Sequence, residues 1–232
     1  MNEHTSKKFD SELEGIRTRV LQMGGMVELQ IVKAMEGLSN GDLLLIDQVI
    51  ENDNRVNLLE IELDEACNQV IAKRQPTAVD LRMVSTVQKT ITDLERIGDE
   101  AKKIAKTAKL QHSTQSSFTP PIRLSHIADA VVDMLRTALD SYARLDTVSA
   151  AQVVRQDKEV DAEFKGIMRQ LITYMMEDPR TISQAIELMF VAKSVERIGD
   201  HAKNIAEYVV YMVKGRDVRH TSLEEIEREA MR

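Results

Sequence analysis

Acidic side chains in this sequence occur in pairs four residues apart, on segments with helical character. Glu95 and Asp99 form one pair, and Glu196 and Asp200 form another. At this spacing two side chains lie on the same side of a helix, about 5 to 6 Å apart. Like charges there destabilise an isolated helix by about 0.2–0.5 kcal/mol, so two such pairs predict a compensating cation nearby.

A second set of oxygen-bearing side chains, again four residues apart, precedes each acidic pair. Asp53 stands with Asn57, and Asp157 stands with Asp161. If the helices that carry the two sets pack antiparallel, four such side chains converge in each half of the chain. Carboxylates without cysteine and with little histidine suit magnesium, manganese or iron, and zinc is tolerated. The sequence therefore predicts metal sites, and Asp161 in place of Asn57 makes the second site the more anionic and tighter one.

The alternative is a solvated face on which lysines of the same helix neutralise the acids. Asp99 can pair with Lys102 or Lys103, and Asp200 can pair with Lys203. Pairs three or four residues apart on a helix interact in this way without any metal. Both interpretations stay open from the sequence.

The acidic pairs belong to an internal duplication. Residues 94–105 return as residues 195–206, with nine of twelve positions identical. A repeat period near one hundred residues is too long for a solenoid unit, so each copy should be a small domain-like bundle. Gly98 and Gly199 lie inside the repeated windows, where glycine costs a helix about 1 kcal/mol relative to alanine. We interpret both as points of close approach by a neighbouring helix.

Apolar residues spaced by three and four predict the helices that carry these groups. In the first half they indicate helices over about 9–38, 43–74 and 77–110, with a break at Asn40-Gly41 and another before Pro76. Short connections between long helices predict antiparallel neighbours. In the second half the pattern restarts after a polar segment with a double proline, and Gly215 is expected to close the last long helix.

These elements predict an all-α fold of two tandem, internally duplicated three-helix bundles. The charged tail is expected to hold a short frayed helix that begins at Thr221 or Ser222. The predicted organisation is a first bundle at 1–110, a linker at 111–121, a second bundle at 122–215 and the tail at 216–232.

Composition agrees with this fold and narrows the function. The chain of 232 residues is 43% hydrophobic and 30% charged, has no tryptophan and carries a net charge of -7. Such a charge disfavours nucleic acid as a partner. Without an apolar run of about 18 residues, we expect no direct membrane insertion and a cytoplasmic location. Cys67, the single cysteine, is expected to be a small buried residue.

Several segments together resemble the PhoU family, accessory regulators of bacterial phosphate transport. They are the two Glu-Arg-Ile-Gly-Asp segments, the early Gln-Met-Gly-Gly-Met-Val-Glu at 22–28, the Ala-Lys-Arg-Gln-Pro-Thr break at 72–77 and Tyr-Met-Met-Glu-Asp at 174–178. The resemblance covers essentially the whole chain. It implies two similar three-helix bundles, a cytoplasmic and usually dimeric protein, and multinuclear metal sites in some members.

In that family the metal motif is an acid followed four residues later by aspartate. Carried over, it falls on Glu95 with Asp99, Glu196 with Asp200 and Asp157 with Asp161. At the remaining position Asn57 departs from the acidic pattern, which weakens the case for Asp53 as a ligand.

The resemblance implies an adaptor and not an enzyme. It implies negative control of the phosphate-starvation response and of phosphate uptake, through contacts with the PhoR sensor histidine kinase and with PstB, the ATPase of the phosphate ABC transporter. The alternative is a carboxylate-bridged metal-binding or metal-dependent enzyme of the helical-bundle type. Such oxidases use Glu-x-x-His on two helices, and this sequence contains no Glu-x-x-His. A purely structural coiled-coil spacer is disfavoured by the interior glycines.

Overall fold

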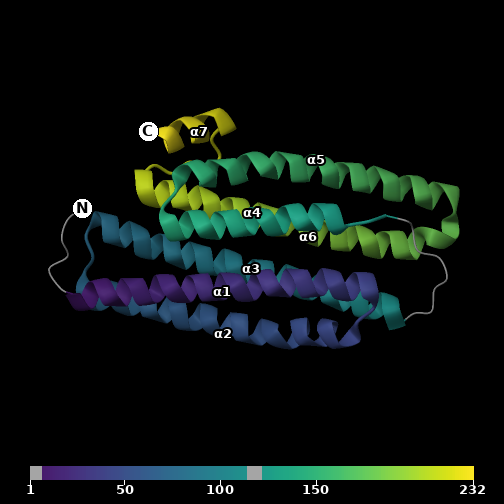
Figure 1. Ribbon diagram of the computed structural model, residues 1–232, viewed down its shortest axis with the longest axis horizontal. Helices are drawn as coiled ribbons and strands as arrows, with labels where there is room; N and C mark the ends of the chain where they lie inside the picture. The colour runs from purple at the N-terminus through teal and green to yellow at the C-terminus, as the bar shows by residue number, and fades with distance from the viewer. Residues whose placement is uncertain (1–6, 114–121) are drawn as a thin grey trace.

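The computed structural model describes residues 7–113 and 122–232. The described part of the chain is helical, as Figure 1 shows. Its elements are α1 (Lys7–Asn40), α2 (Leu43–Arg74), α3 (Ala78–Ser113), α4 (Ser125–Arg144), α5 (Thr147–Glu177), the 3-10 turn η1 (Pro179–Thr181), α6 (Ile182–Lys214) and α7 (Leu223–Met231). Most of the predicted linker lies outside the described residues.

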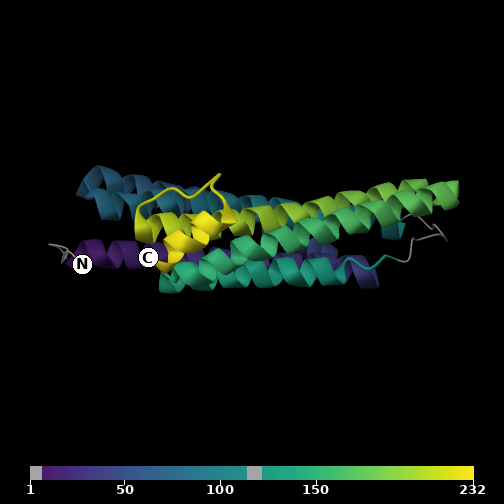
Figure 2. The same ribbon diagram turned by 90° about the horizontal axis from the view of Figure 1, so that it is seen from above.

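Helices α1, α2 and α3 form one antiparallel bundle, and α4, α5 and α6 form the other (Figure 1). The all-α fold with two three-helix bundles is therefore confirmed. The bundles join mainly through α3 and α6, and α1 lies beside α4 (Figures 1 and 2). This arrangement brings the two repeated windows of α3 and α6 together at the centre of the molecule.

Local backbone chemistry ends the helices where the sequence predicts. Gly41 adopts a φ of +71°, and its N–H donates to the Gly37 carbonyl at 2.9 Å. Gly215 adopts a φ of +76° and donates to the Tyr211 carbonyl at 2.8 Å. Both positions need the left-handed conformation that glycine adopts without steric cost. The prediction that Gly215 closes α6 is confirmed.

The apolar stripes form the core. Val20, Met23, Val27 and Ile31 of α1 have no solvent exposure, and the stripes of the other long helices are buried with them. Cys67 is buried in the same cluster, as expected, and burial raises the pKa of its thiol. No helix in residues 7–113 or 122–232 is long and apolar enough to cross a membrane.

The repeated glycines lie where helices approach closely, as predicted. A Cβ at Gly98 would stand 3.3 Å from Gln30 Oε1 and 3.5 Å from Val56 Cγ1. A Cβ at Gly199 would stand 3.4 Å from Val131 Cγ2. Residues of α1 and α2 therefore press against α3 at the first glycine, and α4 presses against α6 at the second.

The C-terminal tail forms the predicted helix from the predicted start but differs from the prediction in its packing. Its helix, α7, starts directly after Ser222, whose hydroxyl accepts a hydrogen bond from the Glu225 N–H at 3.3 Å. This helix is not frayed, because Ile226 and Ala230 are buried against α5. Apolar residues spaced by four along a mostly charged segment were the signal for this packing.

Candidate functional site

The structure places the first acidic site, defined as Asp53, Asn57, Glu95 and Asp99, between α2 and α3. Asp53 is fully buried, and Lys102 of α3 donates to Asp53 Oδ2 at 2.5 Å. The Asn57 amide approaches the same oxygen at 3.5 Å. The pKa of Glu95 is raised, first by burial and then by the charges of Asp99 and other acids. Four side chains predicted from their spacing alone therefore do share one region.

The second acidic site, defined as Asp157, Asp161, Glu196 and Asp200, repeats this arrangement between α5 and α6. Asp157 is buried, and Lys203 donates to its Oδ2 at 2.7 Å. The pKa of Asp200 is raised by burial and by the charges of Glu196 and Asp157. Asp161 lies one turn further along α5 and forms no ion pair with the described basic residues.

In both sites a lysine supplies the cation, but not in the way the sequence suggested. The solvated-face interpretation paired Asp99 with Lys102 or Lys103 of the same helix. Instead Lys102 reaches across to Asp53 of α2, and Lys103 pairs with Glu100 at 2.9 Å. Periodicity along one helix cannot show this, since the choice of partner depends on how the neighbouring helix is rotated.

The same correction applies to the second site, where the sequence paired Lys203 with Asp200. Lys203 bonds to Asp157 of α5 instead. Although burial disfavours the charged ammonium group, its hydrogen bond to Asp157 raises the pKa of Lys203. Each lysine therefore links the second and third helices of its bundle.

Unpartnered oxygen atoms remain around Asp53. The buried atoms Asp53 Oδ1, Asn57 Oδ1 and Gln30 Oε1 have no hydrogen-bond partner. Such oxygens are the donor type that hard cations select. Within the described residues, however, no three or more Asp, Glu, His or Cys side chains lie in a metal-binding arrangement. The donor chemistry fits a metal ion, but the observed geometry is that of a lysine ion pair.

A polar contact between the bundles escaped the sequence reasoning. Asp93 of α3 accepts from His201 Nδ1 at 2.6 Å and from the Asn204 amide at 3.2 Å, both on α6. Arg197 of α6 pairs with Glu100 of α3 at 3.2 Å. His201 points away from the second acidic site and toward Asp93, and its position next to Asp200 predicts that it is no co-ligand of that site. Its partner Asp93 belongs to none of the sequence motifs, so nothing in the sequence pointed to this contact.

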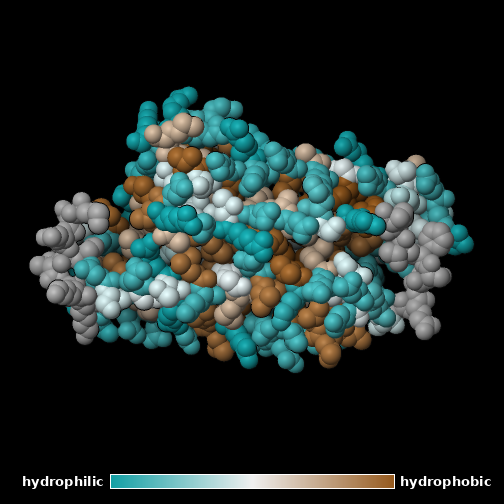
Figure 3. Space-filling view, in the orientation of Figure 1, coloured by the Kyte–Doolittle hydropathy of each residue, from teal (hydrophilic) through white to brown (hydrophobic). Residues whose placement is uncertain are grey.

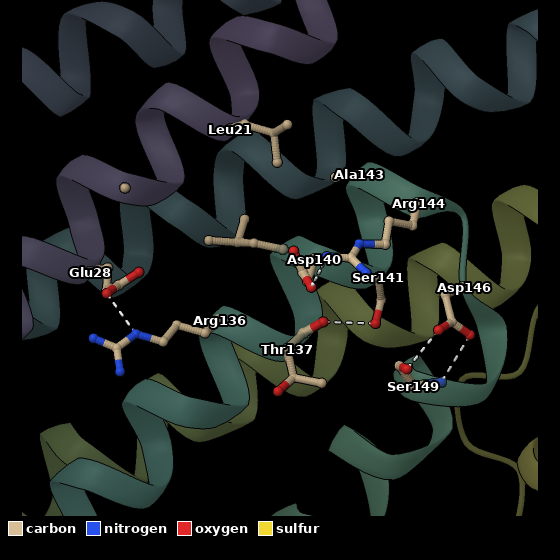
Figure 4. A pocket seen from close by; sticks show the side chains of 12 residues that line it. Leu21, Glu28, Arg136, Thr137, Asp140, Ser141, Ala143, Arg144, Asp146 and Ser149 are labelled. Carbon is tan, nitrogen blue, oxygen red and sulfur yellow. Dashed lines mark hydrogen bonds and ion pairs between the residues drawn. The ribbon is translucent and has the colours of Figure 1, made fainter.

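The face made by α1 and α4 carries two pockets. One, of about 530 Å³, is lined by residues of both helices and of the start of α5 (Figure 4). Its Arg136 donates to Glu28 at 2.7 Å and also borders a second pocket of about 590 Å³. Figure 3 shows hydrophobic side chains between hydrophilic ones on this face. Since Arg144 also pairs with Asp140, these arginines already have carboxylate partners.

A third pocket, of about 310 Å³, lies at the end of the second acidic site. Residues of α5, α6 and the C-terminal segment line it, among them Asp157, Lys203, Glu207 and Arg219. Glu207 is only 6% exposed, and burial raises its pKa to about 7. The position equivalent to Glu207 in the first bundle is Lys106, so this buried carboxyl distinguishes the second site from the first.

Comparison with known proteins identifies the family. The model of the PhoU domain matches this chain twice, at residues 20–108 and 124–209. The phosphate-specific transport system accessory protein PhoU of Serratia marcescens is 49% identical over 98% of this chain and 93% of its own length. The protein of the same name from Escherichia coli K12 is 48% identical over 98% of this chain and 94% of its own length.

A solved structure agrees with the family-model match and with the two relatives. The crystal structure of PhoU from Pseudomonas aeruginosa superposes with a TM-score of 0.86 at 45% identity, and the match covers 90% of this chain and all of that one. Duplicated windows, duplicated bundles and two matches to one family model describe the same architecture. The chain belongs to the PhoU family.

Proposed function

We propose that this protein is an accessory regulator of phosphate-specific transport that acts by binding partners and not by catalysis. The observation that carries the proposal is the identity of 48% to 49%, over almost the whole chain, to proteins named as accessory proteins of that system. The long helices of both bundles supply surfaces for such contacts (Figure 1).

The proposed partners are the transporter ATPase PstB and a PhoR-type sensor histidine kinase. In this proposal the protein works in the cytoplasm as a homodimer and favours the signal-off state of the kinase when phosphate is plentiful. An adaptor shifts its partner's equilibrium only by binding one state more tightly than the other. Loss of its folded surface should therefore remove repression.

Reporter expression from a phosphate-starvation promoter tests this proposal. Cells that lack the protein should express the reporter even in phosphate-rich medium, and re-supply of the wild-type chain should restore repression. Co-purification of the chain with PstB and with the kinase tests the two contacts separately. Full repression in the deletion strain at high phosphate would refute the regulatory function.

We further propose that the acidic sites bind a divalent or trivalent metal ion, with iron, zinc, manganese and magnesium as the candidates. The unpartnered buried oxygens of Asp53 and Asn57 support this proposal. A metal ion there would replace Lys102 as the cation that offsets the carboxylates. A protein that binds metal only when folded is stabilised by mass action.

The double variant Glu196→Ala with Asp200→Ala tests the second site. It should lose bound metal at that site, as measured by elemental analysis of protein purified without an affinity tag. It should also lose any rise in melting temperature that the metal confers, and chelation should remove that rise from the wild type. Full metal content in the variant would show that the site is assigned wrongly.

A further inference from the structure

Because the two bundles are duplicates, they can be compared position by position. One face of the second and third helices differs sharply between them. In the first bundle, this face of α2 and α3 is polar and hydrogen-bonded. Gln88 donates to Asp64 at 2.8 Å and to Asn68 at 3.2 Å. One turn further on, Thr92 donates to Glu60 at 3.2 Å.

In the second bundle the equivalent positions are apolar. The positions equivalent to Glu60, Asp64 and Asn68 lie 104 residues later in the chain, and the position equivalent to Gln88 lies 101 residues later. They are occupied by Phe164, Met168, Ile172 and Met189, which we call the methionine face. The equivalent of Thr92 is Lys193, whose Nζ lies 5.4 Å from the centre of the Phe164 ring.

The methionine face reaches solvent. Ile172 is 46% exposed, and Phe164, Met168 and Met189 are half-buried. Next to them Phe190 and the other apolar side chains at the tip of the α5–α6 pair are also exposed, namely Met176, Ile182 and Ile186. The first bundle shows that the fold accepts polar groups at these positions. Folding therefore does not require the methionine face, and exposed clusters of this kind mark interaction sites.

The methionine face and the second acidic site lie on the same side of the helix pair. Steps of three or four residues keep side chains on one side of a helix. On α5 such steps connect Asp157, Asp161, Phe164, Met168 and Ile172. On α6 they connect Met189, Lys193, Glu196 and Asp200.

This side therefore changes along its length from apolar to acidic. At the apolar end it is open, and at the acidic end α7 and the segment before it cover the helix pair (Figure 2). From Asp161 to Ile172 the distance along α5 is roughly 16 Å at 1.5 Å per residue. A bound helix of about three turns would cover that length.

The acidic end has charge available for a partner. Glu196 pairs with Lys193 at 2.7 Å and Asp157 pairs with Lys203 at 2.7 Å. No described basic residue forms an ion pair with Asp161 or Asp200. When no metal ion occupies the second acidic site, these two carboxylates beside an apolar surface complement a segment that is apolar at one end and basic at the other.

We propose that this side of the α5–α6 pair binds an amphipathic helix of a partner protein, with apolar residues on the methionine face and Lys or Arg at Asp161 and Asp200. The inference rests on the adaptor function proposed above and names the surface and the chemistry of its partner. Methionine side chains adapt to irregular surfaces, which suits a contact that must form and release.

A synthetic peptide of about three helical turns is the probe, with Leu and Met on one half and Lys on the other. Fluorescence anisotropy measures its binding to the full chain, and a scrambled peptide of the same composition is the first control. The test variant carries the residues of the first bundle, Phe164→Glu, Met168→Asp, Ile172→Asn and Met189→Gln. Its matched control replaces exposed apolar residues of α2, with Leu58→Asn and Ile61→Gln.

The methionine-face variant should bind the peptide at least about tenfold more weakly, which corresponds to 1.4 kcal/mol. It should keep the helical circular dichroism of the wild type, and the α2 control should bind normally. Replacement of Asp161 and Asp200 by Asn should reduce the salt dependence of binding. Equal binding by the wild type and the methionine-face variant would overturn the proposal.

Sedimentation equilibrium distinguishes a partner helix from a second copy of this chain on the methionine face. Reporter expression in cells distinguishes failure of the docking surface from failure of the proposed regulatory function. If sedimentation equilibrium shows that the variant loses dimerisation, the occupant is a second copy and the proposed partner helix is wrong. In cells, derepression by the folded variant supports the proposed contact. If deletion derepresses the reporter but the variant represses fully, only the docking surface is refuted.

Discussion

Glu207 makes the stability of the second bundle sensitive to pH. Its pKa is raised from 4.5 to about 7, mainly because burial disfavours the carboxylate, and the charge of Asp157 adds to this while Lys203 opposes it. A carboxyl group whose pKa is higher in the folded state holds its proton when the unfolded chain has released it. The stabilisation of the folded state by this retained proton is therefore fully present below pH 4.5 and is lost as the pH rises to about 7.

Replacement of Glu207 by Gln removes the free-energy cost of ionising a buried carboxyl group. A shift from 4.5 to about 7 corresponds to about 3 kcal/mol at 1.36 kcal/mol per unit. Because the carboxylate lines an open pocket, screening by water reduces the expected effect to about 1–2 kcal/mol. Relative to the wild type, Glu207→Gln should therefore gain about 1–2 kcal/mol between pH 4.5 and pH 8.

Urea unfolding at several pH values between 4.5 and 8 measures this difference. Glu159→Gln, at an exposed position on α5, is the control for the loss of one negative charge. Only the Glu207 variant should show a stability difference that grows with pH. A constant difference over this range would mean that Glu207 titrates in the folded protein as it does in the unfolded chain, and the argument from burial would be wrong.

Further predictions concern the ion pairs and the glycines. Lys203→Met should destabilise the protein by about 3 kcal/mol, measured by urea unfolding at pH 7, because it leaves Asp157 buried and unpaired; a loss below 1 kcal/mol would contradict this. Gly37→Ala should destabilise by about 1–3 kcal/mol, because its Cβ would lie 2.7 Å from Cγ1 of the buried Ile46. Gly199→Ala should change the melting temperature little, since the gain of about 1 kcal/mol in helix propensity offsets a tight contact at 3.4 Å; a large loss would show that the neighbouring helix cannot adjust.

The sequence by itself determined the elements and the faces they bury. Helix periodicity is a local property, so the stripe that contains Val20, Met23 and Val27 predicts its own burial. The breaks at Gly41 and Gly215 follow from single-residue backbone preferences. The acidic pairs and the duplication can also be read directly from the amino-acid sequence. Comparison of the two halves position by position would have exposed the methionine face as well.

The tertiary structure alone decided which charged groups meet. Lys102 bonds to Asp53 and not to Asp99, because the rotation of α3 against α2 places the ammonium group between the helices. Asp93 meets His201 only because α3 packs against α6. Spacing along a helix fixes the side on which a group lies. Its partner on another helix depends on the packing of the whole core, which no local pattern encodes.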